Sequence, residues 1–555
     1  MRLLCILLLT SLQCLAQPLT DSQKLASLGK TWGFLKYYHP AVATGKLDWD
    51  EQLIRLLPQV RRVQNRTGLS AIFLQLLDDL GTVPPCPKCP SVEKTPAHFR
   101  RNLDLSFLDD SATFTKPLRT RLRYVVQNRN QAANYYVQLT EGVVNSRFDN
   151  EKPYADRRNP DEAHRLLALF RYWNVVQYFF PYRYAIDKNW NDVLTDLIPV
   201  FLRADSEQAY QLALYRMVAQ IQDSHGFLTN SDKTVWLRSD LGTYWLPFAM
   251  MLIGNQAVIT RFLNDSLANA NRLKIGMVIK QIDGEPIADR IACERPYTAA
   301  SNESALRRNI ARLLGLGPAG QARLTIDGAG QDSTLTVRRY PYRAFGKQAG
   351  ESVNSRYPVS RWLGDSVGYV NLGRLTTGQA DSVMKSLLSA RAIVFDVRNY
   401  PQGTYWAVAR YLIGAPTPFV SFTAPDLGFP GTYQPAGTAK LPRSNKKPYK
   451  GNVLILANED TQSEAEFTVM GLQAVPNAKV IGSQTAGADG GYVMIPLPGG
   501  YSATMTGQGV YYPDGRETQR IGIVPDVVVK PTLEGIRAGR DEVLERALNV
   551  ARQKD

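Results

Sequence analysis

The sequence predicts a multidomain protein of the α and α/β classes, on three observations. The chain has 555 residues, which is enough for three or four domains. Its first half repeats one spacing of apolar residues that is typical of helices. Its last third alternates short apolar runs with helical patterns, as an α/β layer does. Hydrophobic residues make up 44% and charged residues 21%, so disordered, collagen-like and disulfide-knot classes are excluded.

The charge of the chain bears on its partners. There are 65 Lys and Arg residues against 50 Asp and Glu residues, a formal net charge of +15. A surplus of this kind favours anionic surfaces weakly, but here it is spread along the sequence without a long basic run. Nucleic acid is therefore not an expected partner.

Residues 1–16 have the pattern of a secretory signal peptide. A basic start at Arg2 precedes an apolar run, and Ala16 offers a plausible cleavage place. Lipoprotein anchoring at Cys14 is the alternative, which the bulky Gln13 disfavours. No later segment reaches the roughly eighteen apolar residues of a membrane span. We therefore expect a periplasmic or secreted protein without a membrane span.

Cys86 and Cys89 lie in a proline-rich loop. They could form half of a zinc site, with His98 as a further ligand, but a structural zinc site needs four ligands and the partner pair is missing. The alternative is a local disulfide or an unpaired couple in an oxidising compartment. Neither a metal nor another cofactor is expected.

An internal repeat organises residues 17–235. Eight positions recur without gaps 141 residues downstream. They are Leu25, Leu28, Trp32, Tyr37, Pro40, Trp49, Leu53 and Pro58 in the first copy, and Leu166, Leu169, Trp173, Tyr178, Pro181, Trp190, Leu194 and Pro199 in the second. Each copy predicts a helix that ends at the first proline and a second helix that begins at the later tryptophan. A third helix is expected over 70–80 and 211–221, which makes this a duplicated helical domain.

Residues 236–345 predict a small β domain. Apolar runs over 256–261, 277–282 and 322–326 are typical of strands. Within 276–287, a strand, a tight Asp283-Gly284 turn and a second strand are expected, and a helix is expected over 304–314. The pattern resembles a PDZ domain, a module that binds peptide tails by adding a strand to its sheet. An unrelated small β domain is the alternative.

Residues 346–532 predict an α/β core, and residues 533–555 a C-terminal helix. Strands are expected over 368–372, 392–396, 453–457 and 479–482, with helices over 380–388 and 464–474 between them. The amphipathic run over 540–551 predicts the terminal helix. The stretch 423–450 is rich in Pro, Gly and Lys, and we expect it to be a long exposed loop.

Ser463 falls where the strand over 453–457 passes into a helix. A hydroxyl at such a turn faces a cleft, and the amides of the helix N-terminus can stabilise an oxyanion. The competing interpretation is structural, because Ser463 and Glu466 also have the spacing of a capping box.

His225 is the histidine best placed for chemistry among the four in the chain. It belongs to the run 223–226 (Asp-Ser-His-Gly), directly after the last helix of the second repeat copy. The first copy has Thr-Val-Pro-Pro at the corresponding place. This divergence indicates that the second copy acquired a function at this turn.

Three further runs follow strands of the core: 396–403, 482–487 and 512–526. Together with 223–225, they resemble in order and spacing the C-terminal-processing (tail-specific) and tricorn-core serine peptidases. The most specific elements are 461–466 (Thr-Gln-Ser-Glu-Ala-Glu) and 522–526 (Gly-Ile-Val-Pro-Asp). The resemblance implies a crotonase/Clp-like α/β peptidase core and covers about half of the chain, without the helical repeat.

The resemblance also selects between two versions of the family's chemistry. Tail-specific members use a Ser–Lys dyad, but here no lysine lies between Lys479 and Lys530. Tricorn-like members use a Ser-His-Ser-Glu tetrad, to which Ser463, His225 and Ser224 correspond as nucleophile, base and second serine.

Glu517 corresponds to the glutamate of this tetrad. A serine needs a base to take its proton, and the imidazole needs an acceptor to hold its other nitrogen. The oxyanion would bind to the backbone N–H of Glu464 and to one near Gly403.

The resemblance thus implies a serine endopeptidase that acts on extracytoplasmic polypeptides, with the PDZ-like segment assisting in binding the C-terminal tail. The alternative function is a catalytically inactive peptide- or ligand-binding protein on the same fold. In a plain peptide-binding scaffold, Ser463 would be no more than a helix cap.

Overall fold

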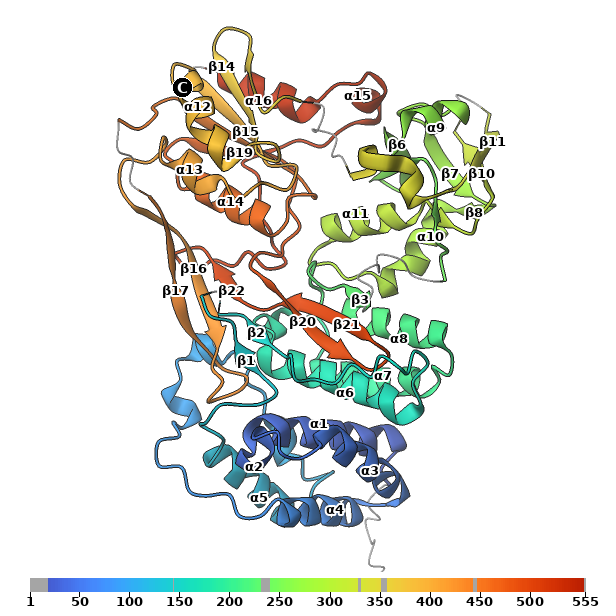
Figure 1. The fold of residues 1–555 in the computed structure, drawn as a ribbon, viewed down its shortest axis with the longest axis vertical. Helices are drawn as coiled ribbons and strands as arrows, with labels where there is room; N and C mark the ends of the chain where they lie inside the picture. The colour runs from blue at the N-terminus through green and yellow to red at the C-terminus, as the bar shows by residue number, and fades with distance from the viewer. Residues whose placement is uncertain are drawn as a thin grey trace, which may run out of the picture.

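The computed structural model describes residues 18–142, 144–230, 240–327, 331–350, 357–442 and 447–553. The expected signal peptide over 1–16 lies outside these ranges. The fold combines helical and sheet parts (Figure 1): a helical region, a small β domain and an α/β region. Among the described residues, no helix combines the length and the apolar character needed to cross a bilayer.

The helical region contains the helices that the repeat predicts. Its helices are α1 (Asp21–Tyr38), α2 (Pro40–Ala43), α3 (Trp49–Arg62), α4 (Arg66–Asp79), α5 (Lys116–Gln127), α6 (Glu162–Phe179), α7 (Trp190–Leu202) and α8 (Glu207–Ala219). A short ladder of β1 (Gln138–Leu139) and β2 (Ser146–Arg147) lies between α5 and α6. The second helix of each copy begins at Trp49 and at Trp190, as expected.

The two copies repeat the same pair of buried hydrogen bonds. The indole of Trp32 donates to the carbonyl of Trp49 (2.7 Å), and the indole of Trp49 donates to the carbonyl of Trp32 (3.0 Å). Trp173 and Trp190 exchange the same two bonds at 2.7 and 3.0 Å. Each pair fixes the first helix of its copy to the second.

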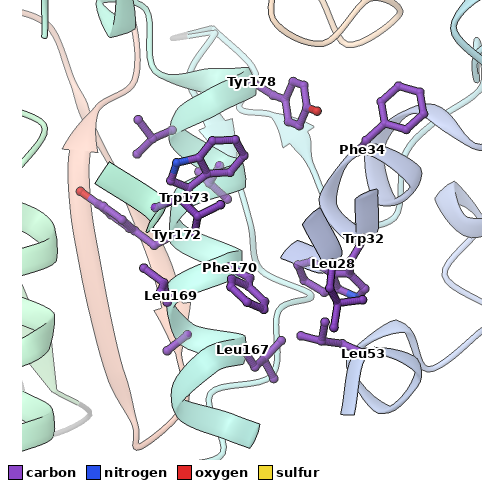
Figure 2. Close-up of a cluster of buried hydrophobic side chains, with 14 of the residues drawn as sticks. Leu28, Trp32, Phe34, Leu53, Leu167, Leu169, Phe170, Tyr172, Trp173 and Tyr178 are labelled. Atoms are coloured by element: carbon purple, nitrogen blue, oxygen red, sulfur yellow. The ribbon is translucent and has the colours of Figure 1, made fainter. Parts of the chain in front are cut away.

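Helices α1 and α6 pack directly against each other. Phe170 and Leu167 of α6 face Leu28 and Trp32 of α1 (Figure 2), and all four side chains are buried. The contact is close because α1 carries Gly33, where an added Cβ would lie 1.9 Å from Cγ of Asn174. Only glycine allows the helices this approach.

A buried charge network joins both copies. The guanidinium of Arg171 on α6 pairs with Asp50 of α3 (2.6 Å) and with Glu151 (2.9 Å). Lys36 of α1 pairs with the other oxygen of Glu151 (2.6 Å). Although burial opposes its ionisation, Arg171 and Lys36 hold the pKa of Asp50 below its usual value. Arg171 also donates to the carbonyl of Pro496 (2.8 Å), so the network reaches the C-terminal part of the chain.

The small β domain has one main sheet with the order β11-β10-β7-β6-β5, and β8 pairs with β7. Its strands and helices are β4 (Tyr244–Trp245), β5 (Phe248–Ile253), β6 (Gln256–Phe262), α9 (Asp265–Ala270), β7 (Val278–Ile282), β8 (Glu285–Pro286), α10 (Ile287–Glu294), α11 (Glu303–Leu313), β9 (Leu316–Gly317), β10 (Gln321–Ile326), β11 (Ser333–Arg338) and β12 (Tyr340–Pro341). The predicted turn at Asp283-Gly284 is confirmed. Both residues have positive φ (55° and 84°), as a tight hairpin requires.

The α/β region has a sheet with the order β13-β14-β15-β18-β19-β23, parallel from β14 onward. Its elements are β13 (Ser360–Leu363), β14 (Val367–Asn371), α12 (Thr377–Leu387), β15 (Ala392–Asp396), α13 (Tyr405–Ala409), β18 (Asn452–Ala457), α14 (Glu464–Gln473), β19 (Ala478–Gly482), β23 (Val527–Val528), α15 (Leu533–Arg537) and α16 (Glu542–Arg552). The strands and helices expected here are confirmed. Parallel strands place their carboxyl ends at one edge of the sheet, where ligands bind in such folds.

The expectation of a long exposed loop over 423–450 is wrong. Strands β16 (Thr417–Pro425) and β17 (Tyr433–Leu441) form a long antiparallel hairpin, and β16 also pairs with β22 (Gly509–Tyr511). Proline and glycine within β17 obscure the strand pattern in the sequence, and one of the two register shifts of the ladder falls at them, between the partners of Ser421 and Thr423.

The tip of this hairpin, residues 426–432, is anchored in the helical region (Figure 1). The hydroxyl of Tyr38 donates to the carbonyl of Pro430, and the amide of Gly431 donates to the carbonyl of Tyr178 (3.0 Å). Phe429 is 1% exposed and packs under the guanidinium of Arg129 at 3.7 Å. The hairpin tip therefore fixes the α/β region to the helical region.

A second connection lies beside the turn that carries His225. Strand β3 (Leu228–Asn230) pairs with β21 (Tyr501–Thr506), which in turn pairs with β20 (Tyr492–Leu497). This small sheet brings the end of the second repeat copy against a hairpin that belongs to the C-terminal part of the chain. It positions residues 223–226 beside the α/β region.

Candidate active site

Ser463 lies at a strained turn between β18 and α14. Its φ of +59° with ψ of −124° is a conformation that side-chain-bearing residues rarely adopt, at a cost of about 1–3 kcal/mol. The backbone N–H of Ser463 donates to the carbonyl of Ala488 (3.0 Å), and its hydroxyl donates to the carbonyl of Gly490 (3.4 Å). Strain of this kind at a strand-to-helix turn is typical of a nucleophilic serine.

The run 488–491, in which a dyad lysine is absent, packs against this turn. Glu466 is fully buried and accepts from the backbone N–H groups of Ser463 (3.3 Å), Gly487 (2.8 Å) and Ala488 (3.0 Å). Burial raises the pKa of Glu466 and, more strongly, that of Asp489. Glu466 therefore ties the helix start to the following loop, as the carboxylate of a capping box does.

His225 is 4% exposed and lies at the end of the small sheet. Its Nδ1 is 2.9 Å from Oγ1 of Thr506 on β21, and its backbone N–H donates to Asp223 (3.1 Å). Burial lowers the pKa of His225, an effect that Asp223 opposes and Arg308 strengthens. This lowering favours the neutral imidazole, the form that a general base needs.

The carboxylate of Asp223 is the centre of a network that sequence reasoning missed. It accepts from the backbone N–H (2.6 Å) and the hydroxyl (3.0 Å) of Thr506, and from the amide of Gln519 (3.1 Å). Asp223 lies two residues before His225 in the run 223–226, and this proximity could have indicated a carboxylate near the imidazole. Nothing in the sequence reveals that Thr506 is its partner.

The loops that carry Ser463 and His225 are in direct contact. The side chain of Gln462 donates to the carbonyl of Ser224 (3.0 Å) and accepts from Arg308 of α11 (2.8 Å). The hydroxyl of Ser224 donates to the carbonyl of Ala486 (2.9 Å) and accepts from the N–H of Ser301 (2.9 Å). The site is therefore assembled from the helical region, the small β domain and the α/β region.

Ser463 and His225 flank one short segment, residues 490–492. Gly490 accepts from the Ser463 hydroxyl, and Tyr492 pairs with Thr506, the residue that holds His225. The rings of Tyr492 and His225 are 6.1 Å apart between centroids. The hydroxyl of Ser463 donates to Gly490 and not to the imidazole of His225.

Glu517 makes its side-chain ion pair with Arg101 of the helical region (2.7 Å) rather than with His225. The hydrogen bond of the imidazole goes to Thr506 instead. The role that the family resemblance gives to Glu517 has no counterpart in these contacts.

The two predicted oxyanion donors lie at the same edge of the sheet. Glu464 is the first residue of α14, so its backbone N–H has no acceptor within the helix. Gly403 follows β15, the strand next to β18, and it has a φ of +63° with open space at its Cβ position.

The cysteines of the proline-rich loop form a disulfide between Cys86 and Cys89. This pairing removes both thiolates as zinc ligands. Within the described ranges, no cluster of three or more His, Cys, Asp or Glu side chains has the arrangement of a metal site.

Comparison with known proteins identifies the α/β region. Residues 366–529 match the sequence profile of Peptidase family S41. A carboxyl-terminal-processing protease from Picosynechococcus is 26% identical over 174 residues, which cover 30% of this chain and 40% of that protein. A carboxy-terminal-processing protease from Bartonella bacilliformis is 33% identical over 92 residues, 17% of this chain and 21% of that protein. The chain thus spans less than half of the length of either relative.

The fold itself extends beyond the matched segment. Mature CPAF, solved in complex with lactacystin, superposes with a TM-score of 0.56 at 13% identity, over 70% of this chain and 98% of that chain. A second structure of mature CPAF gives a TM-score of 0.53 at 14% identity. At this level of identity, the likeness concerns the fold alone.

Proposed function

Because residues 366–529 belong to peptidase family S41, a family of serine peptidases, we propose that this chain is a serine endopeptidase. Ser463 attacks the peptide carbonyl after His225 removes its proton, and an acyl-enzyme forms with release of the amine product. Water activated by His225 then hydrolyses the acyl-enzyme. The observation that carries the proposal is the positive φ of Ser463 at a turn in contact with the loop of His225.

The reaction needs groups that stabilise the developing oxyanion. We assign this role to the backbone N–H of Glu464 at the start of α14 and to a backbone N–H at Gly403, both near the turn of Ser463. Donors of this kind are held by the fold before the substrate binds, so they need no reorganisation during the reaction. Ser224 and Glu517 stay predictions from the family resemblance.

The substrates we propose are extracytoplasmic polypeptides with an accessible C-terminal tail. The Cys86–Cys89 disulfide favours an oxidising compartment. In the PDZ-like segment, α11 packs beside β5, which is the outer strand of its sheet. An extended tail added along β5 would be held between this strand and the helix.

Two half-exposed apolar side chains lie on β20, and the ring of one of them, Tyr492, is 6.1 Å from that of His225. Tyr492 and Met494 project from one face of β20 with 50% and 47% of their surface exposed. The ring of Tyr492 also contacts Phe227, at 5.3 Å between centroids. We propose that they form an apolar subsite for a substrate side chain next to the scissile bond.

Tyr492→Ala is expected to raise KM for a peptide with a large apolar residue at this place, with a smaller change in kcat. Burial of one such side chain contributes about 1.5–3 kcal/mol, which corresponds to roughly 10- to 150-fold in KM. Steady-state kinetics on a pair of peptides, one with Leu and one with Ser at the varied position, measures the effect. An equal increase in KM for the Leu and the Ser peptide would contradict the assignment of the subsite.

A fluorophosphonate probe tests the proposed function directly. Incubation of the purified protein is expected to form one covalent adduct, which peptide mapping assigns to Ser463, and to stop casein digestion in proportion to labelling. A control with heat-denatured protein, in which the site is destroyed, separates specific from random labelling. An unlabelled protein that does not digest casein would instead favour the non-catalytic binding protein, an alternative favoured by the hydrogen bond from the Ser463 hydroxyl to Gly490.

A further inference from the structure

A chain of buried hydrogen bonds leads from His225 to a carboxylate. The imidazole Nδ1 lies 2.9 Å from the Thr506 hydroxyl, which lies 3.0 Å from the carboxylate of Asp223. Thr506 and Asp223 are 0% exposed. Because water does not reach these groups, every donor among them must meet an acceptor within the protein.

The donors around Asp223 determine the direction of these hydrogen bonds. Three N–H groups, from the backbones of His225 and Thr506 and from the side chain of Gln519, point at Asp223. They stabilise an ionised carboxylate, which only accepts hydrogen bonds. The single proton of the Thr506 hydroxyl therefore goes to Asp223, and its oxygen accepts from Nδ1–H of His225.

This direction fixes the tautomer of the neutral imidazole. With the proton on Nδ1, the lone pair of His225 is on Nε2, the nitrogen that Thr506 does not hold. We propose that the carboxylate of Asp223, acting through the hydroxyl of Thr506, positions His225 as a base and stabilises its protonated form. The inference rests on the proposed function for its catalytic meaning, and it gives Asp223 the role that the family resemblance gives to Glu517.

The tautomer is measurable without reference to activity. The chain has four histidines, so labelling with 15N-histidine gives few imidazole signals, and loss of one set in His225→Gln assigns His225. Long-range 1H–15N spectra distinguish a protonated from an unprotonated ring nitrogen. We expect the Nδ1–H form in the wild type near pH 8 and a mixture of tautomers in Thr506→Val.

Matched variants separate positioning from packing. Thr506→Val keeps the shape of the side chain but removes the hydroxyl, whereas Thr506→Ser keeps the hydroxyl and loses a methyl group. We expect Thr506→Val to lower kcat about 10- to 100-fold with little change in KM, as part of the 10²–10⁴-fold that a general base contributes. Thr506→Ser should restore the wild-type tautomer and most of kcat.

The pH profile gives an independent readout. The charged or titratable groups near His225 are Asp223 on its own turn, Arg308 of α11 and Tyr492 of β20. The charge of Asp223 raises the pKa of His225, so its loss in Asp223→Asn must lower that pKa further. We expect the acidic limb of kcat/KM to move to lower pH in this variant, while the maximal rate falls.

Three results would overturn the inference: an Nε2–H tautomer in the wild type, an unchanged tautomer in both Thr506→Val and Asp223→Asn, or a shift in Glu517→Gln as large as that in Asp223→Asn. Failure of the proposed function has a different signature. A wild type that does not hydrolyse peptides but has the Nδ1–H tautomer, lost in Thr506→Val, would refute the peptidase and support the positioning network.

Discussion

Replacing Ser463 by alanine is expected to lower peptide hydrolysis by at least about a thousand-fold and to abolish the fluorophosphonate adduct. The loss is large because Thr461, which also carries a hydroxyl at the β18–α14 turn, is fully buried and donates that hydroxyl to the carbonyl of Val397. As a helix cap alone, Ser463 would contribute only about 1 kcal/mol of stability, and its loss would leave hydrolysis intact. Measuring kcat/KM together with the melting temperature separates the two roles.

His225→Ala should give a loss of similar size, and the double variant should be no slower than either single variant. A hydroxyl and the base that activates it act as one unit, so their contributions do not add. Ser382→Ala, an exposed serine on α12, serves as the matched control and should leave kcat/KM unchanged. Hydrolysis that survives in Ser463→Ala would remove this serine from the mechanism.

Arg171→Met is expected to produce the largest loss of stability, about 3–5 kcal/mol. The substitution keeps an apolar side chain of similar length, but it leaves the carboxylates of Asp50 and Glu151 buried without their guanidinium partner. It also removes the donor to the carbonyl of Pro496, which links the helical region to β20. Urea unfolding followed by tryptophan fluorescence measures the change, because four tryptophans lie in the helical region.

Arg61→Met is the control for this prediction. Arg61 forms an ion pair with Glu162 at the same distance, 2.6 Å, but the two side chains are 34% and 44% exposed. Surface pairs of this kind contribute about 0–1 kcal/mol. Equal losses of stability in the two variants would mean that burial does not determine the effect of the network.

Sequence patterns predicted most of the elements because helices and buried strands have local periodicities. The helices that begin at Trp49 and Trp190, the turn at Asp283 and the parallel strands of the α/β region lie where these patterns place them. The β16–β17 hairpin was not predicted, because its ladder contains proline and glycine and is interrupted by register shifts. Its tip is buried by contacts with the distant helical region, which no local pattern reveals.

The candidate site was predictable to a similar extent. A serine between an apolar strand and a helix can be recognised locally, and so can a histidine after a helix end. The partner of His225 cannot, because Thr506 lies 281 positions away and reaches the imidazole only through the register of β3 against β21. Glu517 was selected by its place in a family motif, whereas its contact with Arg101 depends on a residue 416 positions away.

The anchored hairpin tip has a consequence for biosynthesis. Tyr38 and Pro430 are 392 positions apart, so the surface of α1 that receives the tip stays uncovered while the intervening chain is made. At about 5–20 residues per second, translation of that stretch takes roughly 20–80 s. Ser463 leaves the ribosome later than the tip does. A nascent chain therefore carries His225 well before Ser463, its proposed nucleophile, and the proposed catalysis can begin only after most of the polypeptide has been synthesised.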